Sequence, residues 1–344
     1  MKTILITGGA GFIGSNFVKY MYSKYPDYHL IVLDALTYAG SVQNLPDGGF
    51  DSKKFEFWYG NVRNGEMVDA LVSRSDIVVH FAAESHVTRS IYDNLLFFET
   101  DVIGTQVVSN AVLKYQDKVE RFIHISTSEV YGTAMAEKMT EDHPLNPMSP
   151  YAAAKCGADR LVYSYWTTYG IPAVIIRPFN NYGPNQHLEK VIPRFVTSCT
   201  LNEPMTVHGD GGARRDFMHA RDTCRAIDMV IHADKSKVVG EVINLGSGDD
   251  ISVLEIAQMV KTAMDGKSGC TDIQFVGDRP GQVFRHTCDW SKAQSILGWK
   301  PEISFEDGLK ETAEWYQKNE EWWRPQIWMR HIPIITAGGK RELH

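Results

Sequence analysis

The sequence predicts an α/β fold built on a doubly wound parallel sheet. Short, fully apolar segments alternate with helical patterns through the first half of the chain, and a glycine-rich turn directly follows the first apolar segment. Beyond about residue 177 the pattern changes to short elements broken by proline and glycine. Apolar strands separated by helices are typical of a parallel sheet covered on both faces. We therefore expect one large sheet domain and a smaller, partly discontinuous second domain.

The individual elements follow from hydrophobic periodicity and from the residues that begin or end each segment. Pro26 ends the first helical pattern, and Pro150 stands at a helix start, where proline is favoured. The sequence predicts strands over residues 4–7, 30–33, 55–59, 77–82, 122–125 and 173–176. It predicts helices over residues 12–25, 95–115 and 151–169.

The length of the chain supports a division into two domains. It has 344 residues, and a single domain usually takes roughly 100–200. We expect residues 1–177 to form the first domain and residues 178–344 to form most of the second. A helix within residues 217–232 and a strand within residues 241–246 are expected to return to the first domain.

Composition excludes several classes of protein. The chain carries 35 basic and 42 acidic residues, and this net charge of −7 argues against a nucleic-acid partner. No apolar run approaches the ~20 residues that span a membrane, and the apolar start is too short for a signal sequence. The cysteines lack the spacing of a zinc or dithiol site, so we expect no metal and a reducing, cytoplasmic compartment. They are Cys156, Cys199, Cys224, Cys270 and Cys288.

The glycine-rich turn has the context of a dinucleotide-binding site. Gly8, Gly11 and Gly14 lie between a predicted strand and a predicted helix, where glycine permits a tight turn close to a pyrophosphate. Their spacing, G-x-x-G-x-x-G, departs from the standard G-x-G-x-x-G. Asp34 ends the second predicted strand, where a carboxylate binds ribose hydroxyls and repels the extra phosphate of NADP. These features predict a Rossmann-type domain that binds NAD.

Two further segments predict chemistry on a hydroxyl group. Tyr151 and Lys155 are four residues apart and share one face of a helix, so the ammonium is expected to lower the pKa of the phenol. A phenolate there can take a proton from a sugar hydroxyl while a nicotinamide takes the hydride. Thr127, Ser128 and Glu129 follow a predicted strand, at the edge where ligands bind in this architecture. Glu129 offers an acid/base group for chemistry beyond oxidation.

Together these segments resemble the extended short-chain dehydrogenase/reductases that modify nucleotide sugars, and above all the dTDP-glucose 4,6-dehydratases. The resemblance covers about residues 1–325. It rests also on Asp34-Ala-Leu-Thr-Tyr-Ala-Gly, Ala83-Glu-Ser-His-Val-Thr-Arg-Ser, Asn180-Asn-Tyr-Gly-Pro, Glu189-Lys-Val-Ile-Pro, Arg215-Asp-Phe and Arg279-Pro-Gly. It implies oxidation at C4, loss of water across C5 and C6, and return of the hydride to C6 to give a 4-keto-6-deoxy sugar. It also implies a homodimer.

The resemblance assigns residues to three roles. The catalytic residues would be Thr127, Ser128, Glu129, Tyr151 and Lys155. The NAD-binding residues would be Gly8, Gly11, Phe12, Ile13, Gly14, Asp34, Thr37, Asn61, Val62, Ala82, Ala83, Ser85, Thr100, Tyr151 and Lys155. The residues that bind the nucleotide-diphosphate sugar would be Ser85, His86, Asn181, Glu189, Lys190, Arg215, Asn244 and Arg279.

Three departures from the dehydratase pattern leave the substrate open. Ser128 stands where these enzymes have Asp, Asn61 stands where an Asp usually faces the adenine, and residues 282–284 are less polar than expected. The Thr-Ser-Glu triplet also resembles that of GDP-mannose 4,6-dehydratases and UDP-glucuronate decarboxylases. The alternatives are therefore a UDP-glucuronate decarboxylase, a nucleotide-sugar 4-epimerase and a non-catalytic NAD sensor. The nucleotide (dTDP, UDP, GDP or CDP) and the sugar stay open.

Overall fold

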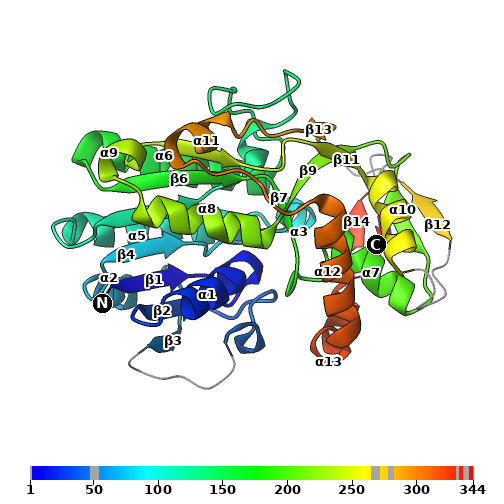
Figure 1. Ribbon diagram of the computed structural model, residues 1–344, viewed down its shortest axis with the longest axis horizontal. Helices are drawn as coiled ribbons and strands as arrows, with labels where there is room; N and C mark the ends of the chain where they lie inside the picture. Colours follow the sequence, from blue (N-terminus) through cyan, green and yellow to red (C-terminus); the bar gives the residue numbers. More distant parts are fainter. Residues whose placement is uncertain are drawn as a thin grey trace.

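The computed structural model describes residues 2–46, 54–264, 272–277 and 283–330, together with the backbone of residues 333–335 and 341–343. The strands and helices of the first half stack on one side of the molecule, and α7 (Val191–Thr200), α10 (Val253–Met264) and α12 (Phe305–Lys318) gather on the other (Figure 1). The functional site forms where these two groups of elements meet.

A parallel sheet of seven strands, in the order β10-β6-β5-β4-β1-β2-β3, forms the centre of the larger group. The chain begins at β1, builds outward to β3, and then continues from β4 toward β10 on the other side. This order is doubly wound, and it leaves a crevice at the carboxyl ends of β1 and β4. The strands are β1 (Thr3–Thr7), β2 (His29–Asp34), β3 (Phe55–Tyr59), β4 (Ile77–His80), β5 (Arg121–Ile125), β6 (Ala173–Pro178) and β10 (Val242–Leu245).

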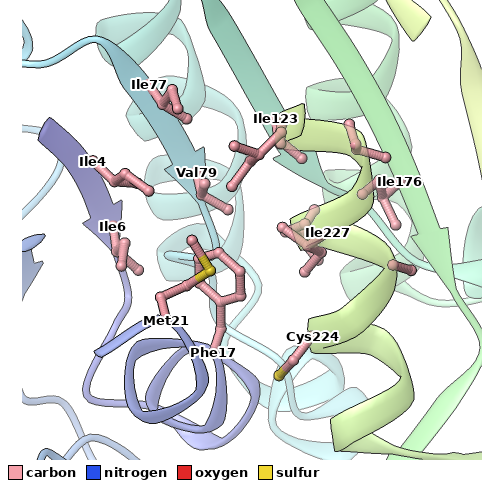
Figure 2. Packing of buried hydrophobic residues seen from close by; sticks show 14 of the residues in the cluster. Ile4, Ile6, Phe17, Met21, Ile77, Val79, Ile123, Ile176, Cys224 and Ile227 are labelled. Carbon is pink, nitrogen blue, oxygen red and sulfur yellow. The ribbon is translucent and has the colours of Figure 1, made fainter. Parts of the chain in front are cut away.

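Helices cover both faces of this sheet. On one face Phe17 and Met21 of α1 and Ile227 of α8 pack toward Ile6 and Val79 of the sheet (Figure 2). Helices α2, α5 and α6 bury the opposite face, which explains why most residues of the central strands are apolar. The helices are α1 (Phe12–Lys24), α2 (Gly65–Val72), α5 (Gly104–Lys114), α6 (Pro150–Tyr169) and α8 (Ala220–His232).

The smaller group has its own sheets and its own core. β9 pairs with β7, β11 and β13, and β8 pairs with β12. Phe195, Val260 and Tyr316 belong to the apolar core between α7, α10 and α12. The strands are β7 (Asn180–Tyr182), β8 (Met205–His208), β9 (Arg214–His219), β11 (Asp250–Ser252), β12 (Ile273–Val276) and β13 (Arg285–His286).

The remaining elements are short. The α-helices are α3 (Val87–Tyr92), α4 (Leu95–Phe97), α9 (Lys235–Val238), α11 (Ser291–Leu297) and α13 (Glu320–Trp323). The 3-10 helices are η1 (Val42–Asn44), η3 (Ser128–Tyr131) and η4 (Arg324–Arg330), and η2 (Phe98–Ile103) is a π-helical turn. β14 (Pro333–Ile335) and β15 (Arg341–Leu343) pair with each other.

The predicted elements form, most of them within one or two residues of their expected bounds, and three depart from the prediction in other ways. The strand predicted over residues 77–82 ends at His80. The helix predicted over residues 95–115 contains the π turn η2, where the hydrogen-bond pattern widens. Within residues 217–232, the first three residues complete β9 and the helix begins at Ala220. The strand within residues 241–246 is β10, which pairs with β6 at the edge of the large sheet.

The cysteines differ from the expectation of a reducing compartment at one position. Cys156, Cys224 and Cys288 are free, whereas Cys199 is disulfide-bonded. Cys270 lies outside the described residues. A disulfide at Cys199 is not what a reducing compartment predicts.

Candidate active site

A cavity of about 490 Å³ lies where the two groups of elements meet. It is lined by the ends of β1, β2, β4 and β5, the edge where ligands bind in doubly wound folds. Its wall runs from the glycine turn past Tyr151 of α6 to Arg215 and Phe217 of β9. The volume is in the range usual for small-molecule sites.

Close backbone contacts require glycine at two positions, one in the turn after β1 and one in the first turn of α1. Gly8 has a φ of +70°, and a Cβ there would lie 2.5 Å from the Ala82 nitrogen. A Cβ on Gly14 would lie 2.2 Å from the Gly8 oxygen, whereas at Gly11 the nearest atom is 3.4 Å away. Gly11 is the N-cap of α1 and provides no side-chain cap. The first amides of this helix therefore remain available to a phosphate.

Asp34 is buried at the end of β2 and is held by backbone amides. Its Oδ1 accepts a hydrogen bond from the Leu36 nitrogen at 2.8 Å, and its Oδ2 accepts one from the Ala10 nitrogen at 2.9 Å. Burial raises the pKa of Asp34, and these hydrogen bonds oppose the rise. A carboxylate beside a glycine turn and a helix N-terminus fits the ribose and pyrophosphate of NAD. The residues at this end of the cavity thus fit the predicted cofactor.

All of the residues predicted to contact NAD line the cavity. Asn61 is among them, and its Oδ1 accepts a hydrogen bond from the Arg63 nitrogen at 2.9 Å. Thr100 reaches the cavity from the π turn η2. The others are Gly8, Gly11, Phe12, Ile13, Gly14, Asp34, Thr37, Val62, Ala82, Ala83, Ser85, Tyr151 and Lys155.

Helix α6 presents Tyr151 and Lys155 to the cavity, as their spacing predicts. Ser149 caps this helix, because its Oγ accepts a hydrogen bond from the Ala152 nitrogen at 3.1 Å. Lys155 Nζ donates to the Ile125 oxygen at 2.7 Å, which ties α6 to the end of β5. The Tyr151 hydroxyl shares a hydrogen bond with the side chain of Thr127.

The pKa values of Tyr151 and Lys155 are shifted differently from what the sequence predicts. Burial raises the pKa of Tyr151 well above its ordinary value, and the hydrogen bond with Thr127 only partly offsets the rise. Burial also lowers the pKa of Lys155, which the charge of Asp101 opposes. The Lys155 ammonium is directed at the Ile125 carbonyl rather than at the phenol. The expected lowering of the Tyr151 pKa by Lys155 is therefore not found in this structure.

Asp101 is a buried residue behind the cavity wall that the sequence did not single out. It lies in the π turn η2, and its Oδ1 accepts a hydrogen bond from the Glu84 nitrogen at 2.8 Å. Burial raises the pKa of Asp101, and the charge of Lys155 opposes the rise. Its Oδ2 has no hydrogen-bond partner among the described residues. The available signal was an acidic residue inside an otherwise apolar helical stretch, since aspartate is rarely buried without a reason.

Thr127, Ser128 and Glu129, which follow β5 after Ser126, point in different directions. Thr127 Oγ1 accepts a hydrogen bond from the Glu129 nitrogen at 3.2 Å, and both side chains line the cavity. Ser128 is 1% exposed, does not line the cavity, and places its Oγ 3.4 Å from Nδ1 of His286. The geometry therefore does not support the predicted catalytic contact of Ser128. The physical reason is that the tight turn of η3 directs neighbouring side chains to opposite sides.

Glu189 lines the far part of the cavity, and other side chains of the protein surround its carboxylate. Tyr38 donates a hydrogen bond to Oε1 at 3.0 Å. Ring nitrogens of His86 and His187 lie 3.7 Å and 3.6 Å from Oε2. Burial alone would raise the pKa of Glu189, but His86 and His187 help to lower it to about 2. Glu189 is therefore ionised, and its negative charge orients the side chains around it. Tyr38 and His187 were not predicted, although Tyr38 lies inside a motif that carried the resemblance.

Two basic side chains line the same part of the cavity, as predicted. Lys190 Nζ donates to the Ser85 oxygen at 2.9 Å. Arg215 Nη1 donates to the oxygens of Arg214 and Phe284, at 2.9 Å and 3.3 Å. Main-chain carbonyls thus fix both cations at the cavity wall, where they suit a diphosphate.

Other predicted substrate residues are placed differently. Asn244 is fully buried on β10, where its Oδ1 accepts from Tyr131 at 2.8 Å and its Nδ2 donates to the Met139 oxygen at 3.0 Å. It does not line the cavity, because both ends of its amide bind the protein interior. Asn181 of β7 lines the cavity, although its Nδ2 donates to the Phe179 oxygen just before that strand. Arg279 lies outside the described residues.

Two classes of site are not found in the described part of the chain. No three histidine, cysteine, aspartate or glutamate side chains lie close enough there to hold a metal ion. Each helix in the same residues is too short or too polar to cross a membrane.

A Rossmann-type sheet with a tyrosine and a lysine of one helix at its cavity defines an extended short-chain dehydrogenase/reductase. The family model described as GDP-mannose 4,6 dehydratase matches residues 5–312, and the chain belongs to this family. The chain is 45% identical to the low-salt glycan biosynthesis protein Agl12 of Haloferax volcanii, over 92% of this chain and 99% of the relative. It is 40% identical to the dTDP-glucose 4,6-dehydratase of Streptomyces niveus, over 94% and 95% of the two chains.

A solved structure agrees with these similarities. The dTDP-glucose 4,6-dehydratase of Bacillus anthracis, in complex with NAD, matches with a TM-score of 0.85 and 39% identity. The match covers 94% of this chain and 99% of that one. Structures of nucleotide-sugar 4-epimerases also share the fold, so the fold alone does not select the reaction.

Proposed function

We propose that the protein is an NAD-dependent 4,6-dehydratase that converts a nucleotide-diphosphate hexose to its 4-keto-6-deoxy form. The observation that carries this proposal is the convergence of Thr127, Glu129 and Tyr151 in a cavity whose other end fits NAD. The similarity to dTDP-glucose 4,6-dehydratases supports it. In this proposal residues 1–177, with α8 and β10, hold the cofactor, and residues 178–344 hold most of the nucleotide sugar.

The oxidation step assigns Tyr151 and Thr127. NAD, when bound, accepts a hydride from C4 of the sugar and later returns it to C6. Tyr151 takes the proton of the C4 hydroxyl, and Thr127 positions that hydroxyl through its own hydrogen bond. Tyr151 acts as a base in its phenolate form, which the hydrogen bond with Thr127 favours while burial opposes it.

The elimination step assigns Glu129 to two proton transfers. A ketone at C4 acidifies C5, and Glu129 removes the C5 proton. The C6 hydroxyl then leaves and needs a proton. Because Ser128 does not reach the cavity, Glu129 is the group that supplies it. The C5 proton and the hydroxide together make one molecule of water, so the step balances. C5 later regains a proton through Glu129 from solvent.

The alternatives are less well supported. A 4-epimerase needs no base at C5, yet Glu129 lines the cavity. Ser128, the residue that favoured a decarboxylase, lies outside the cavity wall. A non-catalytic NAD sensor would not need Tyr151 and Thr127 to be joined by a hydrogen bond at the cavity.

We propose dTDP-glucose as the substrate, because relatives and a solved structure with that activity match nearly the whole chain. The test incubates purified protein separately with dTDP-glucose, UDP-glucose, UDP-N-acetylglucosamine, GDP-mannose and UDP-glucuronate, and measures product masses. Loss of water without added NADH, fastest from dTDP-glucose, is expected. Loss of carbon dioxide from the glucuronate alone would contradict the proposal, as would turnover of none of them. Tyr151→Phe serves as the inactive control.

We also propose a homodimer and a cytoplasmic location. Exposed apolar side chains gather on α3, α4, η2 and α6, which contact one another, and this supports association of two copies through that surface. Three free cysteines support a cytoplasmic location, whereas the disulfide at Cys199 argues against it. Cell fractionation of the tagged protein tests the location.

A further inference from the structure

A buried histidine stands directly behind the proposed acid/base residue and has no part in the mechanism described so far. His286, at the end of β13, is fully buried. Its Nδ1 lies 3.9 Å from Oε1 of Glu129 and 3.4 Å from Oγ of Ser128. Its Nε2 lies 2.6 Å from the oxygen of Gly132. One imidazole therefore contacts three residues of the turn that carries Glu129.

The fold holds this ring in place. β13 pairs with β9, so that His286 lies beside Arg215 in register. On either side of it, Nε of Arg285 and Oγ1 of Thr287 donate to Oδ2 of Asp250, each at 2.6 Å. Rotating the ring away from Glu129 would break its bond to Gly132. The orientation of His286 is therefore built into the backbone around it.

The Gly132 carbonyl determines which ring nitrogen carries the proton. A carbonyl only accepts, so Nε2 donates to it, and in the neutral ring Nδ1 keeps its lone pair toward Glu129. Burial lowers the pKa of His286, and the charges of Arg215 and His143 act in the same direction. The Glu129 carboxylate and the Gly132 carbonyl oppose them without reversing the shift. The neutral ring is therefore the favoured form.

We propose that His286 is a positioning residue for Glu129, accepting a hydrogen bond from the Glu129 carboxyl once that carboxyl has taken the C5 proton. This inference rests on the proposed function. Before proton transfer, 3.9 Å is too long for a hydrogen bond, so the carboxylate is left free to face C5. After the transfer, a small rotation of Glu129 brings its O–H to Nδ1.

The proposed step balances without moving a proton onto the histidine. The electrons of the C5–H bond form the C5–C6 double bond, and the C6–O bond breaks. The departing hydroxide takes its proton from Glu129, which becomes a carboxylate again. His286 stays neutral and favours the protonated carboxyl, because only the acid can donate to its lone pair. While Glu129 is ionised, the Ser128 hydroxyl donates to the same nitrogen. In this way Ser128 contributes to the reaction through its hydrogen bond to His286, although it does not line the cavity.

The test separates oxidation from elimination in three variants. His286→Phe removes both nitrogens, and His286→Asn restores an acceptor near the place of Nδ1. His143→Phe is the matched control, because His143 is also buried nearby and binds main-chain groups through both nitrogens. With dTDP-glucose, reduction of bound NAD is followed by absorbance, entry of solvent deuterium at C5 by mass spectrometry, and release of water by product mass.

In His286→Phe we expect NAD reduction near the wild-type rate. Water loss and C5 exchange should be slowed about 10–100-fold, the loss that follows removal of a hydrogen-bond partner that orients a metal-binding side chain. His286→Asn should recover most of the elimination rate, and His143→Phe should retain it. Unchanged elimination in His286→Phe would overturn the inference. So would equal slowing of both steps, the same loss in His143→Phe, or no recovery in His286→Asn. If the wild-type protein releases no water from any donor, the proposed function itself fails.

Discussion

At the scale of single residues, the reaction depends on which side chains of a short turn reach the cavity. Thr127 holds the amide of Glu129, and both side chains face the ligand space. Ser128 lies between them and points into the protein toward His286. A substitution of Asp by Ser at such a position therefore removes an acid without placing a new polar group against the substrate. The chemistry of elimination is concentrated on Glu129.

Replacing Glu129 by Gln should stop the second half of the reaction and leave the first. The amide cannot take the C5 proton, so solvent deuterium should no longer enter at C5, with a loss of about 10²–10⁴-fold in elimination. Reduction of bound NAD by dTDP-glucose should continue, since Tyr151 is unchanged. Mass spectrometry and the absorbance of reduced nicotinamide measure the two steps. Glu141→Gln, a substitution outside the cavity wall, is the control. Normal C5 exchange in Glu129→Gln would show that the base is misassigned.

At the scale of elements, close backbone contacts between β1 and the start of α1 determine the shape of the NAD end of the cavity. Gly14→Ala places a Cβ 2.2 Å from the Gly8 oxygen, whereas Gly11→Ala meets its nearest atom at 3.4 Å. We expect Gly14→Ala to cost about 1–3 kcal/mol of stability and to weaken NAD binding, because the backbone must shift. Gly11→Ala should change the stability and the affinity for NAD far less. Thermal unfolding and NAD titration compare the pair, and equal effects would contradict this account of the turn.

A buried ion pair joins α6 to β6 beneath the active site. Nε and Nη2 of Arg177 donate to the two carboxylate oxygens of Asp159, at 2.8 Å and 2.9 Å. Burial alone would raise the pKa of Asp159, but Arg177, together with Arg160 and Ser126, lowers the pKa below the ordinary value. Ionised Asp159 therefore contributes stability above the ordinary carboxyl pKa. This contribution is lost as the pH falls through the lowered pKa of the folded protein.

Removing the charge of Asp159 should be costly. Asp159→Asn leaves the Arg177 guanidinium buried without its counter-charge, and we expect a loss of about 3–5 kcal/mol in the free energy of unfolding. The variant should also lose part of the dependence of stability on acid pH. Denaturant unfolding at neutral and acid pH measures both effects. Asp69→Asn, which breaks a surface pair with Lys114, should have little effect. A similar loss in the two variants would be inconsistent with this explanation.

At the scale of the whole molecule, the site lies between two groups of elements, and one outer face of the larger group is unusually apolar. On α3, α4, η2 and α6 the exposed apolar side chains are Ile91, Tyr92, Leu95, Leu96, Phe98, Ile103, Tyr163 and Tyr169. These elements contact one another, and exposed apolar side chains gathered in one region commonly mark a protein interface. The same helices carry Thr100, Asp101 and Tyr151. A dimer at this surface would therefore also stabilise the elements that position these residues.

The dimer can be tested by placing a charge on this face. Leu95 is 63% exposed, and Leu95→Glu should convert a wild-type dimer to a monomer because the carboxylate would be buried between two copies. Met135→Glu is the matched control, since Met135 is 73% exposed on a loop outside these helices. Light scattering coupled to size-exclusion chromatography measures the mass. A wild-type monomer, or a dimer unaffected by Leu95→Glu, would refute the proposed interface.

The sequence predicted correctly those features whose geometry is set within one segment, and it failed for features that depend on contacts between distant segments. The glycine turn, Asp34 and the pair Tyr151 and Lys155 were found because their spacing in one segment already fixes their geometry. Asn244 was misplaced because only the family resemblance assigned it to the substrate, whereas its amide is bonded to Tyr131 and Met139 in the interior. The pKa of Tyr151 was also misjudged, because burial, which no local spacing reveals, outweighs the expected effect of Lys155.

The sequence by itself determined the parallel sheet, the cofactor turn and the helix that carries Tyr151 and Lys155, because periodicity and spacing act within a segment. Only the tertiary structure showed that Asp101 lies beside Lys155, that Glu189 is held by Tyr38, and that His286 stands behind Glu129. Each of these contacts joins segments far apart in the chain. Their geometry depends on how the sheet, the helices and the second group of elements pack together, and that packing is decided only when the whole chain folds.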